Sequence, residues 1–356
     1  MSRRDIYYWK CDRPAAFHGT GERRSHAELE AALRRALAAH FDERDFQLTP
    51  GGGQGNHLTF RTRLAGEEVF IRVEDGPESD DHMAAESRVM SEVRARGVPV
   101  PRVLAFDASR RRVPFAWQVL EHIPHPDLNE LHKRGTLDLA AVALDIGAAV
   151  ARWQSIAPRG FGPFDPAQDH LESFHASYAD YFRLHLDRHL RFLVQHRFLS
   201  MDEMDEIDAE IERHRALLAL ERGCLVHKDL ALWNILGTPT HIGAFIDWDD
   251  AISGDPMDDL SLLACFHDGA IVARAFAGYA SVRPLPDEHR RRFWLHLLRN
   301  MIVKSVIRVG AGYFERTDGF YLIGTGSTGA ELKAFTHARL AAALSGLRED
   351  LPIESL

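Results

Sequence analysis

The chain contains the stretch Cys224-Leu-Val-His-Lys-Asp-Leu-Ala-Leu-Trp-Asn-Ile-Leu236, followed closely by Ala244-Phe-Ile-Asp-Trp-Asp249. Each part begins with a hydrophobic run that predicts a short strand, so the polar residues that follow are expected on loops at strand ends. Among them Asp229, Asn234 and Asp247 supply two carboxylates and an amide oxygen, which are hard ligands that suit Mg²⁺ better than Zn²⁺. An Asp that orients a hydroxyl, followed by an Asn and an Asp that hold a Mg²⁺-nucleotide, is typical of phosphoryl transfer.

Two linked motifs make this pattern specific. His-x-Asp-x-x-x-x-Asn fits residues 227–234, and Ile-Asp-Trp with a Gly-Asp-Pro-x-x-Asp-Leu tail fits residues 246–260. Together they resemble the aminoglycoside phosphotransferase and choline kinase family, a branch of the protein-kinase-like fold, over about residues 45–270. The resemblance implies ATP- and Mg²⁺-dependent transfer of the γ-phosphate to a hydroxyl of a small molecule, such as an aminoglycoside-like antibiotic or an amino sugar. The alternatives are a metabolite kinase acting on a sugar, fructosamine, choline or homoserine, and a nucleotide-binding pseudokinase.

Composition limits the other possibilities. With 356 residues and 45% hydrophobic content, the chain is long enough for two lobes. A net charge of −9 makes a nucleic-acid partner unexpected. The cysteines Cys11, Cys224 and Cys265 form no CxxC pair, so neither a zinc site nor a disulfide framework is predicted. We expect a cytoplasmic protein with no membrane partner, because no signal-peptide core or long apolar run is found. The oligomeric state stays open.

Hydrophobic patterns predict strands first and helices afterwards. Strands are expected at residues 58–64, 69–73, 103–106 and 115–120, with helices at 25–41 and 80–95. After an extended connector at 121–126, helices are expected at 137–156, 171–197, 201–221, 256–267, 286–310 and 330–347. We therefore predict an α+β, bilobal protein-kinase-like fold. Residues 1–121 form a nucleotide-binding lobe with a small antiparallel sheet and an N-terminal extension, and residues 122–356 form a larger, mainly helical lobe with the catalytic loop and acceptor site.

The resemblance implies that the first lobe binds ATP. Backbone N–H groups of a glycine-rich loop are candidates to lie over the phosphates, and they belong to Gly52, Gly53, Gly55 and Asn56. Such clusters more often only form turns, so the position of this one before a hairpin is what favours the binding role. The backbone groups of Glu121 and Ile123, on the connector, are expected to meet the adenine edge.

The first lobe lacks the lysine that usually grips the α and β phosphates and pairs with a helix glutamate. No Lys occurs from residue 11 to residue 132. We expect Arg72 in its place, paired with Glu86, because a guanidinium binds phosphate in a bidentate way. An ordinary exposed strand residue is the alternative for Arg72, and Arg61 and Arg63 are rival candidates.

The motif residues receive separate roles. Asp229 is the expected catalytic carboxylate, and Asn234 and Asp247 are the expected Mg²⁺ ligands, brought together by a hairpin that turns at residues 237–240. His227 is expected to hydrogen-bond the backbone near Asp247.

Three further positions support this loop or start the next helix. Asp259 is expected to brace the catalytic loop, and Asp255 to cap a helix that starts at once with Pro256. The Lys228 ammonium is expected either beside the reacting phosphate or in solvent, and the sequence is compatible with both positions.

Acidic side chains of the second lobe are candidates to meet substrate amines, although each is more often an ordinary surface acid. They are Asp249, Asp250, Glu315 and Asp318. The run Gly324-Thr-Gly-Ser-Thr-Gly329 matches GxGxxG but has no second parallel strand after it, so a substrate-side loop is favoured over a dinucleotide site. His185 and His189 are expected on an ordinary helix face and not at a metal.

Overall fold

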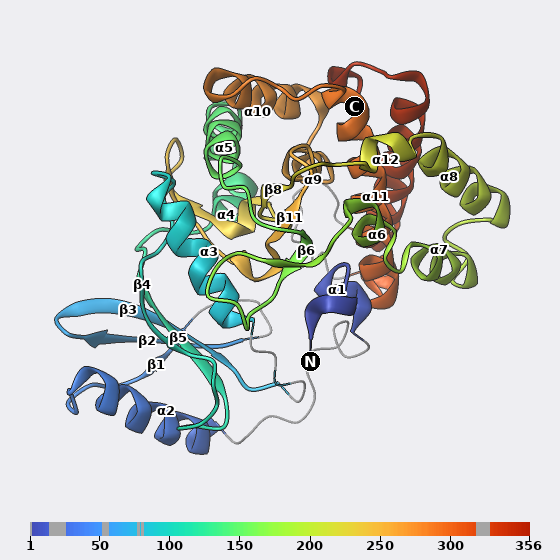
Figure 1. Ribbon diagram of the computed structural model, residues 1–356. Helices are drawn as coiled ribbons and strands as arrows, with labels where there is room; N and C mark the ends of the chain where they lie inside the picture. Colours follow the sequence, from blue (N-terminus) through green and yellow to red (C-terminus); the bar gives the residue numbers. More distant parts are fainter. Residues whose placement is uncertain (1, 14–25, 52–56, 77–78, 80–81, 318–327) are drawn as a thin grey trace.

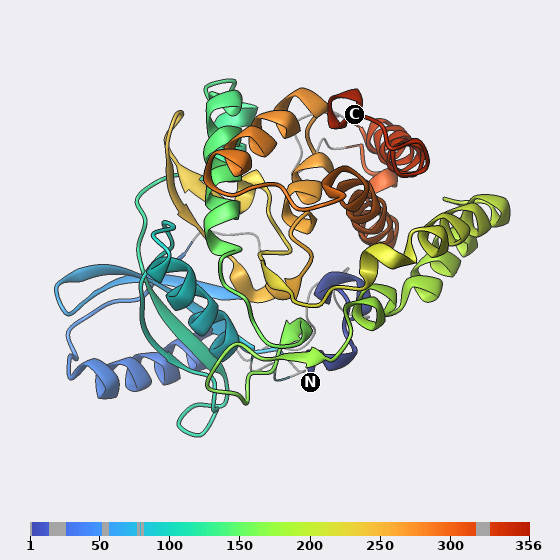
Figure 2. The same ribbon diagram turned by 45° about the horizontal axis from the view of Figure 1, so that its top comes forward.

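The computed structural model describes residues 2–13, 26–51, 57–76, 79, 82–317 and 328–356. An antiparallel sheet with two helices forms one part, and a larger helical part lies beside it (Figure 1). The same two parts can be followed in the second view (Figure 2). No helix in the described ranges is both long and apolar enough to cross a membrane.

The described strands of the first part form a five-stranded sheet in the order β1-β2-β3-β5-β4. These strands are β1 (Thr49–Pro50), β2 (Leu58–Leu64), β3 (Glu67–Glu74), β4 (Val103–Asp107) and β5 (Ala116–Glu121). Side chains alternate between the two faces of the sheet. Ile71 and Val119, which are paired across β3 and β5, belong to the core under α2 (His26–Phe41). The next pair, Arg72 and Gln118, therefore points to the opposite face.

That opposite face is covered by α3 (Met83–Ala95). Gln118 Nε2 donates a hydrogen bond to Ser87 Oγ on α3 at 2.8 Å. The alternation of β3 thus directs Arg72 toward α3, and the apolar residues on either side of it toward α2.

The second part is built from helices, a four-stranded sheet and a hairpin. Its helices are α4 (Leu128–Lys133), α5 (Leu139–Trp153), α6 (Tyr178–Arg183), α7 (Leu186–Gln195), α8 (Met201–Arg213), α9 (Asp258–Ala264), α10 (Gly269–Val282), α11 (His289–Gly310) and α12 (Gly329–Glu349). Its strands are β6 (Phe161–Phe164), β7 (Ser173–His175), β8 (Cys224–Val226), β9 (Ile235–Gly237), β10 (Ile242–Phe245) and β11 (Ile252–Gly254). The sheet order is β7-β6-β11-β8, and β9 pairs with β10.

Helices α5 and α10 cross so closely that glycine is needed at the contact. A Cβ on Gly147 would lie 1.8 Å from the Ala275 carbonyl oxygen, and one on Gly278 would lie 1.9 Å from that of Leu144. Both clashes are with backbone of the other helix, which has little room to move away.

The N-terminal segment, residues 2–13, carries the 3₁₀ turn η1 (Arg3–Asp5) and α1 (Trp9–Asp12). It packs against the helical part beside α6 and α11 (Figures 1 and 2). Tyr7, Tyr8 and Cys11 belong to the core of that part and not to the core under the sheet. The division at residues 121 and 122 stays a prediction.

Several expected elements differ in detail. The single helix expected at residues 171–197 is wrong, because β7, α6 and α7 occupy this range and the chain turns at His185, whose φ is +57°. Helix α10 was missed, since the exposed positions of its Gly- and Ala-rich sequence are mostly Ala and Val, so it lacks a clear polar face. Asp255 accepts a hydrogen bond from Met257 N, and α9 begins only at Asp258, later than expected.

Candidate functional site

Strand β8 leads directly into the loop that carries His227, Lys228 and Asp229. Asp259, in the first turn of α9, accepts hydrogen bonds from the backbone N–H groups of His227 (3.0 Å) and Lys228 (3.1 Å). Trp153 Nε1 donates to the same carboxylate at 3.0 Å. Lys228 has a φ of +68°, a backbone conformation that non-glycine residues adopt rarely. The expectation that Asp259 braces this loop is confirmed.

His227 fixes the loop to the start of the second motif. Its Nε2 lies 3.0 Å from the carbonyl oxygen of Ile246, the residue before Asp247. Burial lowers the pKa of His227, so the ring is neutral and donates this bond. The expected hydrogen bond to the backbone near Asp247 is therefore confirmed.

Asp229 is 3% exposed and surrounded by donors. Its Oδ1 accepts from the Tyr8 hydroxyl at 2.8 Å and lies 3.2 Å from Lys304 Nζ. Its Oδ2 accepts from Asn234 Nδ2 at 3.1 Å and lies 3.9 Å from Lys10 Nζ. Burial alone would raise the pKa of Asp229, but Lys304, Lys10 and Tyr8 together hold this pKa below its ordinary value. The carboxylate is thus ionised and can orient a hydroxyl group.

The β9–β10 hairpin brings Asn234 and Asp247 to the same end. Ile246 N donates to Asn234 O at 2.9 Å across the hairpin. The Asn234 amide nitrogen also donates to the Asp229 carbonyl oxygen at 2.8 Å, and no bond to its amide oxygen from a described residue is recorded. The side chain of Asp247 is 39% exposed. An uncommitted amide oxygen and an accessible carboxylate fit the donor set that Mg²⁺ takes from protein when phosphates complete its shell.

The sheet contributes Arg72 to the same region. Arg72 Nη1 donates to the buried Glu86 carboxylate on α3, and Nη2 lies 3.1 Å from Asp247 Oδ1. Partial burial and the nearby Asp249 carboxylate raise the pKa of Asp247. A cation beside Asp247 would relieve this repulsion. The expected pairing of Arg72 with Glu86 is confirmed, whereas Arg61 and Arg63 are exposed on β2.

The solvent alternative for Lys228 is wrong. The side chain is 1% exposed, and its Nζ lies 2.6 Å from Asp258 Oδ2. It also donates to the Tyr7 hydroxyl and to Asn300 Oδ1, both at 3.2 Å. Although burial alone would lower it, Asp258 raises the pKa of Lys228, so the ammonium is charged and its three N–H donors have partners within the protein.

The candidate substrate acids are not grouped as a free anionic surface. Arg3 Nη1 donates to the carbonyl oxygen of Asp249, and the Arg3 guanidinium lies 3.6 Å from the Asp249 carboxylate and 3.9 Å from that of Asp250. Glu315 is exposed in the turn η6 (Tyr313–Glu315). Asp318 lies outside the described residues.

The predicted nucleotide residues are only partly described. Gly52, Gly53, Gly55 and Asn56 lie outside the described residues. The Glu121 backbone N–H already donates to Arg102 O at 2.9 Å. The Ile123 N–H makes no recorded bond to a described residue, so it is available to an acceptor such as a nucleobase.

Sequence reasoning missed Arg3, Tyr8, Lys10 and Lys304, which all reach these acids. Residues 2–13 have no clear period, so nothing in their sequence indicated where they would pack. Lys304 did leave a signal, since it interrupts the apolar run Met301-Ile-Val-Lys-Ser-Val306 on α11. A lysine that is buried in such a run needs an anionic partner.

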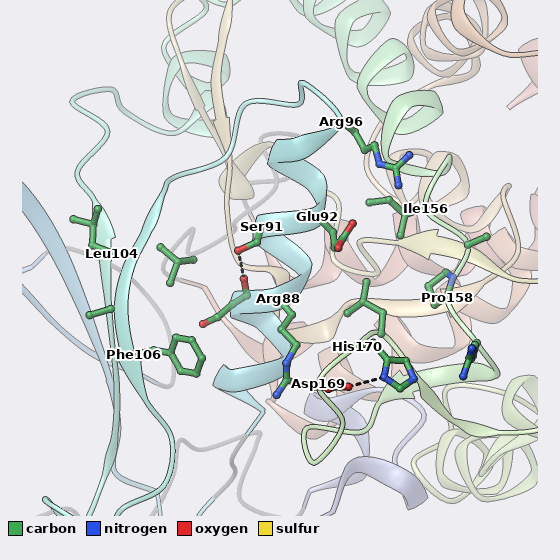
Figure 3. Close-up of a pocket in the computed structure, with 16 residues that line it drawn as sticks. Arg88, Ser91, Glu92, Arg96, Leu104, Phe106, Ile156, Pro158, Asp169 and His170 are labelled. Carbon is green, nitrogen blue, oxygen red and sulfur yellow. Dashed lines mark hydrogen bonds and ion pairs between the residues drawn. The ribbon is translucent and has the colours of Figure 1, made fainter.

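A cavity of about 700 Å³ lies elsewhere, between α3, β4 and the segment at residues 156–171 (Figure 3). Its lining includes Arg88, Arg96, Phe106 and His170, and none of the predicted site residues is among the lining residues. The candidate site is therefore defined by converging polar side chains and not by this cavity.

Comparisons with known proteins give one family match and a set of structural neighbours. Residues 47–294 match the phosphotransferase enzyme family, APH. The fold is similar to that of a thermostable mutant of aminoglycoside phosphotransferase APH(4)-Ia, solved with ADP and hygromycin B, with 18% identity, a TM-score of 0.62, and coverage of 88% of this chain and 98% of that one. For a fructosamine-3-kinase, described as putative, from Thermobifida fusca YX-ER1, the identity is 18%, the TM-score 0.60, and the coverage 87% and 98%. No curated protein matches.

At these identities the structural similarity supports the fold alone. The relatives share a sheet lobe and a helical lobe, so the predicted α+β protein-kinase-like fold is confirmed.

Proposed function

Because the chain belongs to the phosphotransferase enzyme family, we propose that it transfers the γ-phosphate of ATP, with Mg²⁺, to a hydroxyl of a small molecule of the aminoglycoside or amino-sugar type. The observation that carries this proposal is the ionised, buried Asp229, bonded to Asn234, at the hairpin end where Asp247 meets Arg72. The cytoplasmic location stays a prediction.

In this proposal Asp229 orients the acceptor. A carboxylate with a lowered pKa is a weak base, but phosphoryl transfer depends more on positioning and charge stabilisation than on proton removal. Asp229 accepts a hydrogen bond from the acceptor hydroxyl and takes its proton late in the reaction. Asp259 and His227 keep the loop in place, as their bonds to the backbone support.

Asn234 and Asp247 would hold Mg²⁺, which when bound neutralises charge on the nucleotide phosphates. Arg72 would bind the α and β phosphates through its guanidinium, kept in position by Glu86. The Ile123 N–H would donate a hydrogen bond to an acceptor on the adenine edge, and the glycine-rich loop at residues 52–56 remains a candidate for phosphate binding.

A second candidate acceptor class is a fructosamine-like or other metabolite. Its support is that Arg3 already pairs with Asp249 and Asp250, which leaves these acids less available to substrate amines. Glu315 and Asp318 stay candidates for binding an amine, and a contact between the acceptor and residues 324–329 is likewise proposed only.

The test is ADP release measured with Mg·ATP against a panel of aminoglycosides, amino sugars, fructosamines, choline and homoserine. We expect one class to stimulate ADP formation well above the rate without acceptor, and Asp229→Asn to remove this stimulation. Tight nucleotide binding without turnover on any acceptor would instead identify a pseudokinase and contradict the proposal.

A further inference from the structure

The N-terminal segment, residues 2–13, lies outside the part of the chain that matches the family, yet it reaches the carboxylate at the centre of the site. Tyr8 donates to Asp229, and the Lys10 ammonium lies 3.9 Å from the same side chain. The function of this segment is not explained by the family match.

The segment is fixed in place by contacts on several sides. Asp12 Oδ2 accepts the backbone N–H groups of Tyr7 (2.8 Å) and Tyr8 (3.1 Å), while Asp12 Oδ1 lies 2.9 Å from His189 Nε2 on α7. The Tyr7 ring stacks on Tyr181 with centroids 5.0 Å apart. A segment held in this way presents its side chains in a defined geometry, as a group that acts in catalysis requires.

Lys10 is the residue of this segment that combines charge with access. Its side chain is 43% exposed, and its ammonium lies 3.9 Å from Asp229 Oδ2, which is beyond hydrogen-bonding distance. The carboxylates of Asp229, Asp250 and Asp247 act on it together and raise the pKa of Lys10 above its ordinary value. A charged ammonium, whose N–H donors are not taken up by any residue that the structure describes, thus lies among the acids that flank the reacting position.

The other two lysines near Asp229 differ from Lys10. The Lys304 side chain is 9% exposed and pairs with Asp229 Oδ1, so its charge is committed to the carboxylate. Lys228 donates to Asp258, Asn300 and Tyr7. Neither has the exposure of Lys10.

We propose that Lys10 is a catalytic residue, whose ammonium contacts the phosphoryl group during its transfer and stabilises the negative charge on the phosphoryl oxygens. The inference rests on the proposed function. The acceptor oxygen forms a bond to the γ-phosphorus, and the bond from that phosphorus to the β,γ-bridging oxygen breaks, with its electron pair leaving on ADP. The acceptor proton passes to Asp229, and Lys10 keeps its own proton throughout. A fixed cation at developing charge acts mainly on the transition state, so it changes kcat more than KM.

The test compares Lys10→Met, which keeps the length of the side chain but removes the charge, with Lys10→Arg, which keeps the charge. Lys333→Met, at an exposed position on α12, is the matched control. The affinity for Mg·ADP and for Mg·ADP with aluminium fluoride, a mimic of the transferring phosphoryl group, is measured by calorimetry alongside turnover on the stimulating acceptor.

We expect Lys10→Met to lower kcat by about 100-fold, the scale seen when one preorganised donor is removed, with KM for ATP and acceptor changed little. The wild type should bind Mg·ADP with aluminium fluoride more tightly than Mg·ADP alone, and Lys10→Met should lose most of this difference while its affinity for Mg·ADP stays unchanged. Lys10→Arg should recover part of the lost kcat and part of the lost affinity for the aluminium fluoride complex, and Lys333→Met should match the wild type.

An unchanged aluminium fluoride affinity, or a change confined to the KM of the acceptor, would overturn the role of Lys10. These outcomes are distinct from failure of the proposed function. If the wild type binds nucleotide but turns over no acceptor, the calorimetric comparison still tests whether the Lys10 ammonium contacts the mimic of the transferring phosphoryl group.

Discussion

Replacing Lys228 by Met should destabilise the protein strongly, because it isolates a buried carboxylate. Lys228 is 1% exposed and Asp258 is fully buried, with 2.6 Å between the ammonium and Asp258 Oδ2. Asn300 Nδ2 would remain as a donor to Asp258 Oδ1 at 2.8 Å and His296 Nδ1 would remain 4.0 Å from Asp258 Oδ2, but neither replaces the ion pair with the ammonium at 2.6 Å. Removing one partner of a buried ion pair costs about 3–5 kcal/mol. We expect about 3 kcal/mol here, since Asn300 keeps one hydrogen bond.

The assay is urea unfolding followed by tryptophan fluorescence, with the free energy of unfolding compared at equal m-value. The double variant Lys228→Met with Asp258→Asn removes both charges and should recover all but about 1–2 kcal/mol of the wild-type stability. The exposed Lys333→Met serves as control and should stay within about 0.5 kcal/mol of the wild type.

Two results would show that Lys228 does not stabilise the fold by pairing with the buried Asp258 carboxylate. A loss below about 1 kcal/mol for Lys228→Met would mean that Asp258 is not left as an unpaired buried charge. A double variant as unstable as the single one would mean that the effect of Lys228 does not pass through Asp258.

Three further changes test other contacts. Gly278→Ala should destabilise the fold by about 3 kcal/mol or more, measured by urea unfolding, because its Cβ would lie 1.9 Å from the Leu144 carbonyl oxygen; an unchanged midpoint would contradict the close α5–α10 crossing. Burial lowers the pKa of His189 to about 4, so below the ordinary value the unfolded chain takes up a proton that the folded one does not. His189 alone should therefore lower the free energy of unfolding by about 1.6 kcal/mol between pH 6.5 and pH 5, and His189→Gln should reduce the loss seen in the wild type by about that amount; equal pH dependence in both proteins would argue against it. Arg72→Met should raise the Kd for Mg·ATP by at least about tenfold in calorimetry, while Arg63→Met, at an exposed position, should leave this Kd unchanged. A larger rise in the Kd for Arg63→Met than for Arg72→Met would instead favour Arg63 as the phosphate-binding arginine.

The sequence predicted those parts of the site in which neighbouring residues carry the signal. His227 and Asp229 follow β8, and the β9–β10 hairpin lies between Asn234 and Asp247, so local pattern was enough to expect their convergence. The pairing of Arg72 with Glu86 could be expected because β3 and α3 are consecutive in the chain. Strand alternation directs Arg72 to the face that α3 covers.

Contacts between distant parts of the chain were not predictable in this way. Tyr8 and Asp229 are 221 residues apart, and the contact depends on how residues 2–13 pack on the helical part. The environment of Lys228 likewise depends on Asn300 of α11 and on Tyr7, so its burial away from solvent was not predictable from its neighbours in the sequence. Helix α10 was missed because its exposed positions are mostly Ala and Val, so its sequence lacks the polar face on which a periodicity prediction relies.

Asp229→Asn is the sharpest test of whether Asp229 orients the acceptor hydroxyl in a phosphotransferase site. This variant keeps the size of the side chain and removes the charge, so acceptor-stimulated ADP formation should fall by about 1,000-fold or more, while the Kd for Mg·ATP stays close to that of the wild type. Acceptor-stimulated turnover within tenfold of the wild-type rate would contradict the claim.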